Sequence, residues 1–215
     1  MELGLNGNET MNTADYFAKE LLAKLDTQDP IFAAFEAQDE SKKVGFDFTE
    51  IEDVLERALD EVRETREAYE EGEEGRVHFG DEIADLAFSL TNLIRHRGVA
   101  GTDLIETDAL TTDKLETVDV IVATEDIAED MKTIADRTVS DEEAKATYEA
   151  AMQKCAILAN SFGFNVGTLL RENVKKYLDR CEAIEILAAQ DQKSWDDLYK
   201  AGEIVKYWKR AKEIL

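Results

Sequence analysis

The chain has 215 residues, of which 44% are hydrophobic, and it contains one proline and 11 glycines. A chain of this size and composition can bury the core of one sizeable domain or two small ones, which excludes wholesale disorder. Its 49 acidic residues against 25 basic ones give a formal net charge of −24. Such a surface repels nucleic acids and anionic lipids, so we expect neither a nucleic acid nor a membrane as a partner.

The sequence shows no feature of a membrane-spanning or secreted protein. No apolar run approaches the roughly 20 residues that a transmembrane helix needs, and the N-terminal residues lack the basic and apolar regions of a signal peptide. Cys155 and Cys181 are too few for a disulfide framework and lie in helical patterns. We therefore expect a cytoplasmic protein with two buried thiols.

Few turn-forming residues and long stretches of Ala, Leu, Glu, Lys and Arg predict an almost entirely α-helical chain. Capping residues and glycines set the expected helix ends. The predicted N-caps are Asp29, Thr49, Ser140, Asn165 and Ser194, and the predicted stops are Gly98 and Gly163. In chain order, the expected helices cover residues 14–25, 30–38, 50–71, 79–97, 114–137, 141–162, 166–190 and a last one from 195 that carries both tryptophans.

Two of these helices carry paired acidic residues beside an apolar stripe. In the helix expected to start after Thr49, apolar residues recur at helical spacing, and Glu61 and Glu64 flank that stripe. In the next helix, Glu82 and Asp85 lie on the corresponding flank. The short EEGEEG connection favours antiparallel packing, which can turn the two acidic flanks toward each other.

Four carboxylates that converge in this way need a cation. Two unit charges 4 Å apart repel by about 4 kcal/mol at an effective dielectric constant near 20. All-oxygen ligation suits Mg²⁺ or Mn²⁺ rather than zinc, which usually recruits Cys or His. The predicted metal ligands are Glu61, Glu64, Glu82 and Asp85. The alternative is an ordinary solvated flank, because such acidic spacings are common in an acidic protein.

The same residues resemble a known family. DExxE at 60–64 and DEIADLAF at 81–88 are similar to the EExxE and EExGDLLF motifs of the MazG-type nucleoside triphosphate pyrophosphohydrolases. The resemblance covers about residues 30–100 and, more weakly, residues 155–180. Three further segments resemble family motifs in the same order, namely 30–48 (ending VGFDF, against VGFDW), 90–99 (against NLARHLGV) and 173–180 (against NxxKLxxR).

The resemblance implies an antiparallel helical bundle, usually oligomeric, that hydrolyses nucleoside triphosphates to monophosphate and pyrophosphate. It implies Mg²⁺, with Mn²⁺ as a substitute, at the four acids already singled out, and attack of water on the α-phosphate. The implied catalytic residues are Asp60, Glu61 and Glu64, and Asp60, which replaces a family glutamate, would orient or deprotonate the water.

The resemblance also implies a set of substrate-binding residues. These are Asn173, Lys176 and Arg180, with Lys175 competing for the role of Lys176, and Phe48, which replaces the family tryptophan. For the basic group the alternative is a solvated helix face, and for Phe48 it is anchoring of a loop to the core. His78 and Arg76 lie just before Glu82 and could reach a phosphate, although a surface role is the ordinary expectation for a lone histidine.

In short family members the closing motif follows soon after the second acidic helix, whereas here a long further segment intervenes. An internal repeat, in which residue 58 corresponds to residue 123, is one explanation: ALDEVRE (58–64) aligns with ATEDIAE (123–129), and Gly98 with Gly163. The second copy carries Glu125, Asp126 and Glu129 but has Thr147 and Ala150 in place of the second acidic pair. The expected division is an N-terminal helical segment (1–28), a half with the acidic site (29–110), a degenerate half (111–190) and a C-terminal helix (191–215).

Three functional classes follow from these patterns. The first is the Mg²⁺-dependent pyrophosphohydrolase, acting as a homo-oligomer such as a dimer, or as a pseudo-dimeric monomer. The second is a related enzyme, either dUTPase-like or a phosphoribosyl-ATP pyrophosphohydrolase, which shares acidic helical motifs. The third is a non-catalytic acidic interaction protein descended from such an enzyme, an alternative that the degenerate half favours and the four intact acids oppose.

Overall fold

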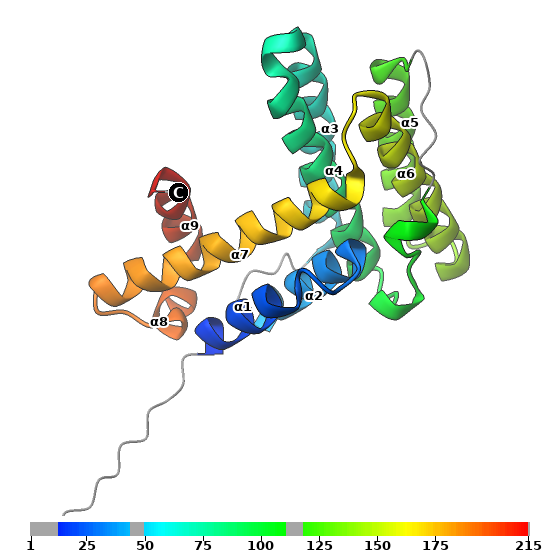
Figure 1. Cartoon of the computed structure of the whole chain (residues 1–215). Coiled ribbons are helices and arrows are strands. Elements are labelled where there is room, and N and C mark those ends of the chain that lie inside the picture. Colours follow the sequence, from blue (N-terminus) through cyan, green and yellow to red (C-terminus); the bar gives the residue numbers. More distant parts are fainter. Residues whose placement is uncertain (1–12, 44–49, 111–117, 215) are drawn as a thin grey trace, which may run out of the picture.

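The computed structural model describes residues 13–43, 50–110 and 118–214, and within these ranges all regular structure is helical (Figure 1). The prediction of an all-α chain packed as a helical bundle is confirmed. The α-helices are α1 (Thr13–Lys24), α2 (Pro30–Lys43), α3 (Ile51–Glu70), α4 (Arg76–His96), α5 (Val120–Ala135), α6 (Asp141–Ser161), α7 (Val166–Gln190), α8 (Trp195–Lys200) and α9 (Ile204–Ile214). Short 3-10 helices are η1 (Gly72–Gly75), η2 (Gly101–Asp103) and η3 (Thr107–Ala109).

The helices form two groups (Figure 1). Helices α3, α4, α5 and α6 stand side by side as an upright four-helix bundle, joined by contacts of α3 with α4 and α5 and of α6 with α4 and α5. Helix α7 runs across α4, with α1 and α2 packed along it and α9 standing on its far end. No helix in the described part of the chain has the length and apolarity needed to cross a membrane.

Most of the predicted helix starts are confirmed by their caps. Asp29 accepts from the backbone N–H of Ile31, and Asn165 accepts from that of Thr168. Ser140 and Ser194 accept from the backbone N–H groups of residues 143 and 197. Four predictions need correction. Helix α4 begins at Arg76 rather than at residue 79, and α5 spans Val120–Ala135, after the N-cap Asp119, rather than residues 114–137. The N-cap of α3 is Glu50 rather than Thr49, which lies outside the described residues, and the expected last helix is two helices, α8 and α9, separated at Gly202, whose φ is +66°.

The hairpins α3–α4 and α5–α6 match at three helix boundaries, whereas α3 has 20 residues and α5 has 16. Helices α4 and α6 both contain 21 residues, and the repeat that aligns residue 58 with residue 123 also aligns their first and last residues and the ends of α3 and α5. Under the same alignment, each buried residue of α6 falls on a buried residue of α4. Gly98 and Gly163, which follow the two helices, correspond to each other and have φ of +88° and +82°. The left-handed backbone that favours glycine therefore recurs at both helix ends.

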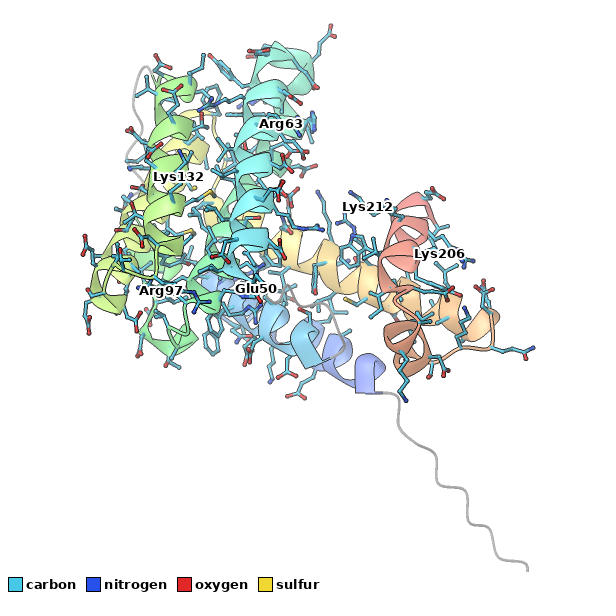
Figure 2. The ribbon with its side chains drawn as sticks, turned by 180° about the vertical axis from the view of Figure 1, so that it is seen from behind. Glu50, Arg63, Arg97, Lys132, Lys206 and Lys212 are labelled. Carbon is cyan, nitrogen blue, oxygen red and sulfur yellow. The ribbon has the colours of Figure 1, made fainter. Side chains whose placement is uncertain are left out.

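Two contacts between the hairpins are related in the same way. The Arg76 guanidinium donates to the backbone O of Phe162 (2.6 Å), and the Arg97 guanidinium donates to the Asp141 carboxylate (3.2 Å). In the repeat, Asp141 is the counterpart of Arg76, and Phe162 is the counterpart of Arg97. Under this alignment the two contacts are therefore reciprocal, each joining one residue to the counterpart of the other contact's partner. Figure 2 shows Arg97 at the end of the bundle where α4 meets the α5–α6 turn.

Candidate metal centre

Helices α3 and α4 are held together at the level of their acidic residues by a buried threonine. The Thr65 hydroxyl donates to the backbone O of Glu61 (2.7 Å) and lies 3.4 Å from the backbone O of Glu82 on α4. Ala58 and Ala68, each fully buried, let the two helix backbones approach closely. The short η1 connection reverses the chain, so the acidic flanks of the two helices face each other.

Three of the four predicted ligands converge at the interface between α3 and α4, which we call the seam. Glu61, Glu64 and Glu82 each offer a carboxylate oxygen, and the three oxygens lie within 4.8 Å of one another. Glu82 is only 8% exposed, and its Oε2 is buried without a hydrogen-bond partner. A buried acceptor left without a partner is costly in a folded protein unless an ion or a water satisfies it.

The pKa values of the cluster reflect this crowding. Burial, followed by the negative charges of Asp85, Glu64 and Glu82, raises the pKa of Glu61 from 4.5 to about 8. Burial and the neighbouring carboxylates Asp85 and Glu64 also raise the pKa of Glu82, although His78 opposes the shift. Without a cation the cluster therefore retains a proton near neutral pH, and a divalent cation would compete for the same oxygens.

Asp85 connects the cluster to α7. The Asn173 side-chain amide donates to Asp85 Oδ1, and the positive charges of Arg180 and Lys176 act on the same carboxyl group. Burial still raises the pKa of Asp85, with the Asn173 hydrogen bond and the two cations opposing it. Lys176 Nζ also lies 2.7 Å from Asp81 Oδ1, next to the acidic seam. Helix α7 thus places an amide and two cations beside the carboxylates.

His78, on the first turns of α4, bridges two carboxylates. Its Nε2 lies 3.0 Å from Glu82 Oε1, and its Nδ1 lies 3.1 Å from Glu71 Oε2 at the end of α3. The hydrogen bond to Glu71, with the charges of Glu71 and Glu82, raises the pKa of His78. The contact to Glu82 was missed in the sequence, although its i,i+4 spacing on one helix was a usable signal.

The other predicted site residues are not part of the cluster of three carboxylates. Asp60 has a side chain 62% exposed and lies 3.8 Å from Arg63 on its own helix. Lys175 pairs with Asp179, 2.6 Å away on α7, rather than with a residue of α4. Phe48 lies outside the described residues. Trp208 of α9 packs on Tyr177, and the Arg180 guanidinium lies 5.5 Å from the centre of its indole ring.

Comparisons with models of protein families, with curated protein sequences and with solved structures find no match for this chain.

The residues fit a hard divalent cation. Carboxylate oxygens bind Mg²⁺ at about 2.0–2.1 Å, so oxygens on opposite sides of one ion lie about 4.2 Å apart. The spread of 4.8 Å among the three oxygens exceeds this span by an amount that small side-chain rotations can close. Glu82 Oε2 has no hydrogen-bond partner. The three candidate ligands are all carboxylates, with no Cys among them, and His78 contacts the other oxygen of Glu82, Oε1. This chemistry favours Mg²⁺ or Mn²⁺ over Zn²⁺.

The corresponding positions of the second hairpin do not form such a cluster. Asp126 and Glu129, the counterparts of Glu61 and Glu64 in the repeat, are exposed, and Glu129 pairs with Lys132, 2.6 Å away. Lys132 on α5 is marked in Figure 2. Position 147, which corresponds to Glu82, is a threonine whose hydroxyl bonds to its own helix (2.9 Å to the backbone O of residue 143). These acids are solvated surface residues.

Proposed function

We propose that the chain is a Mg²⁺-dependent hydrolase that cleaves nucleoside triphosphates, ribo or deoxy, into nucleoside monophosphate and pyrophosphate. The observation that carries this proposal is the convergence of Glu61, Glu64 and Glu82, the last with an unpartnered buried Oε2, beside the cations of α7. The MazG-like order of motifs in the sequence agrees with it. A charge of −24 would repel a nucleotide, so a site that accepts one needs a metal and local bases.

The residues divide into three roles. The cation would be held by Glu61, Glu64 and Glu82. Asp85 adds a fourth carboxyl group beside them, and the Asn173 amide fixes its orientation. Lys176 and Arg180 neutralise phosphate charge as it develops in the transition state. Asp60, exposed at the rim of the seam, accepts the proton of the attacking water.

The reaction requires one bond to form and one to break. A divalent cation in this site supplies polarisation of the phosphate oxygens and activation of the attacking water. The water oxygen bonds to the α-phosphorus while its proton passes to a carboxylate. The bridging bond between the α- and β-phosphates breaks, and pyrophosphate leaves with its charge opposite Lys176 and Arg180.

We further propose that α3–α4 and α5–α6 are two copies of one hairpin and that the fused chain takes the place of a dimer. The common offset of helix ends, buried positions and left-handed glycines in α4 and α6 supports this, as do the exchanged contacts of Arg76 and Arg97. The second copy then supplies packing partners to α3 and α4, but no second centre. Sedimentation at a mass of 24.2 kDa is expected, and a stable dimer would contradict this part of the proposal.

The test is a panel of nucleoside triphosphates with Mg²⁺, scored for pyrophosphate and monophosphate. Reaction in ¹⁸O-water should place the label in the monophosphate, because attack occurs at the α-phosphorus. Glu64→Gln should abolish the activity, whereas Glu129→Gln, its counterpart in the second hairpin, should retain it. Release of orthophosphate, label in the pyrophosphate, or an equal effect of the two substitutions would contradict the proposal.

A further inference from the structure

Glu82 is held asymmetrically. Its Oε1 lies 3.0 Å from His78 Nε2, whereas its Oε2 is buried without a partner. A carboxylate with one oxygen occupied by a donor is fixed in orientation, and its second oxygen remains free to bind a metal. With Oε1 engaged by His78, Oε2 is the oxygen of Glu82 left to bind a cation shared with Glu61 and Glu64.

His78 is itself held from the other side. Its Nδ1 lies 3.1 Å from Glu71 Oε2, so the imidazole ring spans from the end of α3 to the second turn of α4. Carboxylate oxygens only accept, so with both glutamates ionised each ring nitrogen donates an N–H. The imidazole is half-exposed, so burial among other side chains does not fix its place. Its orientation is therefore set by these two contacts.

The second hairpin lacks both the histidine and the carboxylate Glu82 that it contacts. Position 143, which corresponds to His78, is an exposed glutamate, and position 147, which corresponds to Glu82, is a threonine. Glu143 contacts the capping Ser140 of its own helix through its backbone N–H. The histidine thus accompanies the carboxylate that it contacts and is absent where that carboxylate is absent.

We infer that His78 is a positioning residue, which acts through Glu82 and holds its Oε2 toward the metal, with Glu71 fixing the imidazole from behind. This inference rests on the proposed metal site of α3 and α4. It assigns His78 a role in metal affinity and no contact with the nucleotide. Outer partners of metal ligands typically contribute 10- to 100-fold to metal affinity.

The experiment is a titration of the full-length protein with Mn²⁺, followed by the EPR signal of the free ion and without nucleotide. His78→Ala should weaken Mn²⁺ binding about ten-fold, and His78→Gln, which retains an N–H donor, should recover most of it. Glu71→Gln should weaken binding less than His78→Ala does. Glu143→Ala is the matched control in the second hairpin and should bind Mn²⁺ like the wild type.

Kinetics in parallel separate positioning from direct substrate binding. His78→Ala should raise the Mg²⁺ concentration for half-maximal activity, with little change in the KM for the nucleotide at saturating Mg²⁺. Unchanged Mn²⁺ affinity in His78→Ala, alongside weakened binding in Glu64→Gln, would overturn the role of His78 and leave the metal site standing. A wild-type protein that binds no Mn²⁺, or binding unaffected by Glu64→Gln, would overturn the metal site and this inference together.

Discussion

Helices α4 and α6 share their length, most buried positions and the glycines that follow them, yet the acidic residues of the α3–α4 and α5–α6 hairpins lie in different environments. On α3, Glu61 and Glu64 face Glu82 across a buried seam. On α5, the corresponding acids point to solvent, and Glu129 is neutralised by a lysine one turn away. An acidic pair on one helix therefore becomes a candidate metal site only when the facing helix supplies carboxylates in a buried position.

Helix α7 adds a second difference. It contacts α4 through Asn173 and Asp85, although it follows directly after α6 in the chain. The first hairpin thus has an amide and two cations beside its acids, whereas the acids of α5 remain open to water. Three substitution experiments test how far the two hairpins differ.

The largest expected effect concerns catalysis. Glu82→Gln should lower kcat/KM about 100-fold or more, because it removes a charged ligand worth at least about 2.7 kcal/mol in the transition state. Adding Thr147→Glu should not restore activity, since the second hairpin lacks the facing acids in a buried position. Pyrophosphate release at saturating Mg²⁺ is the measurement. Recovery of activity in the double variant would show that the second hairpin is a latent centre.

An intermediate effect is expected on stability without metal. The raised pKa of Glu61, about 8 against 4.5, means that the folded state holds this proton more tightly than the unfolded chain does. The contribution of this protonated carboxyl group to the free energy of unfolding is fully present below pH 4.5 and is lost as the pH rises to about 8. In EDTA at pH 8.5, Glu61→Gln should therefore be more stable than the wild type, by on the order of 1–3 kcal/mol.

The matched control for this experiment is Asp126→Asn on α5. Its carboxyl group is exposed, so the substitution should change the free energy of unfolding by less than about 0.5 kcal/mol at either pH. Urea unfolding at pH 4.5 and 8.5 measures both variants, and millimolar Mg²⁺ should remove the advantage of Glu61→Gln by stabilising the wild type. Equal effects of the two substitutions would contradict the difference between the hairpins.

The smallest effects concern the exchanged contacts between the hairpins. Arg97→Ala should cost about 2 kcal/mol, because its nearly buried side chain bonds to Asp141 and to the backbone O of Asp136 and Val139. Arg76→Ala should cost about 1 kcal/mol, because its side chain is more exposed. The two costs, measured by urea unfolding, should add in the double variant. A large coupling between the two sites would argue against two separate, equivalent contacts.

The sequence alone predicted much of the fold and part of the site. Helical periodicity and caps located most helices, and the flank positions of Glu61, Glu64 and Glu82 predicted their convergence, because a short turn leaves antiparallel packing as the simple arrangement. The family resemblance predicted Asn173, Lys176 and Arg180 as nucleotide-binding residues, which stays a prediction, and their position beside Asp85 was not predicted. Helical periodicity does not reveal which distant helix covers a given face.

Other features followed from tertiary structure and could not be predicted. The helix break at Gly202 requires a left-handed backbone conformation. The residues on both sides have a helical pattern, so the sequence does not show that the helix ends there. The contact of His78 with Glu71 joins the two ends of a turn, so its geometry depends on how η1 closes.

The hydrogen bond between Asp85 and Asn173 joins residues 88 positions apart. During synthesis, α3 and α4 leave the ribosome long before α7, so the nascent chain displays its acidic face without the helix that later covers it. Contacts of such sequence separation form late because a long loop must close first. Assembly of the acidic cluster with its α7 neighbours is thereby deferred until nearly the whole polypeptide has been made, and a chain truncated before α7 would carry its carboxylates with neither the amide nor the cations beside them.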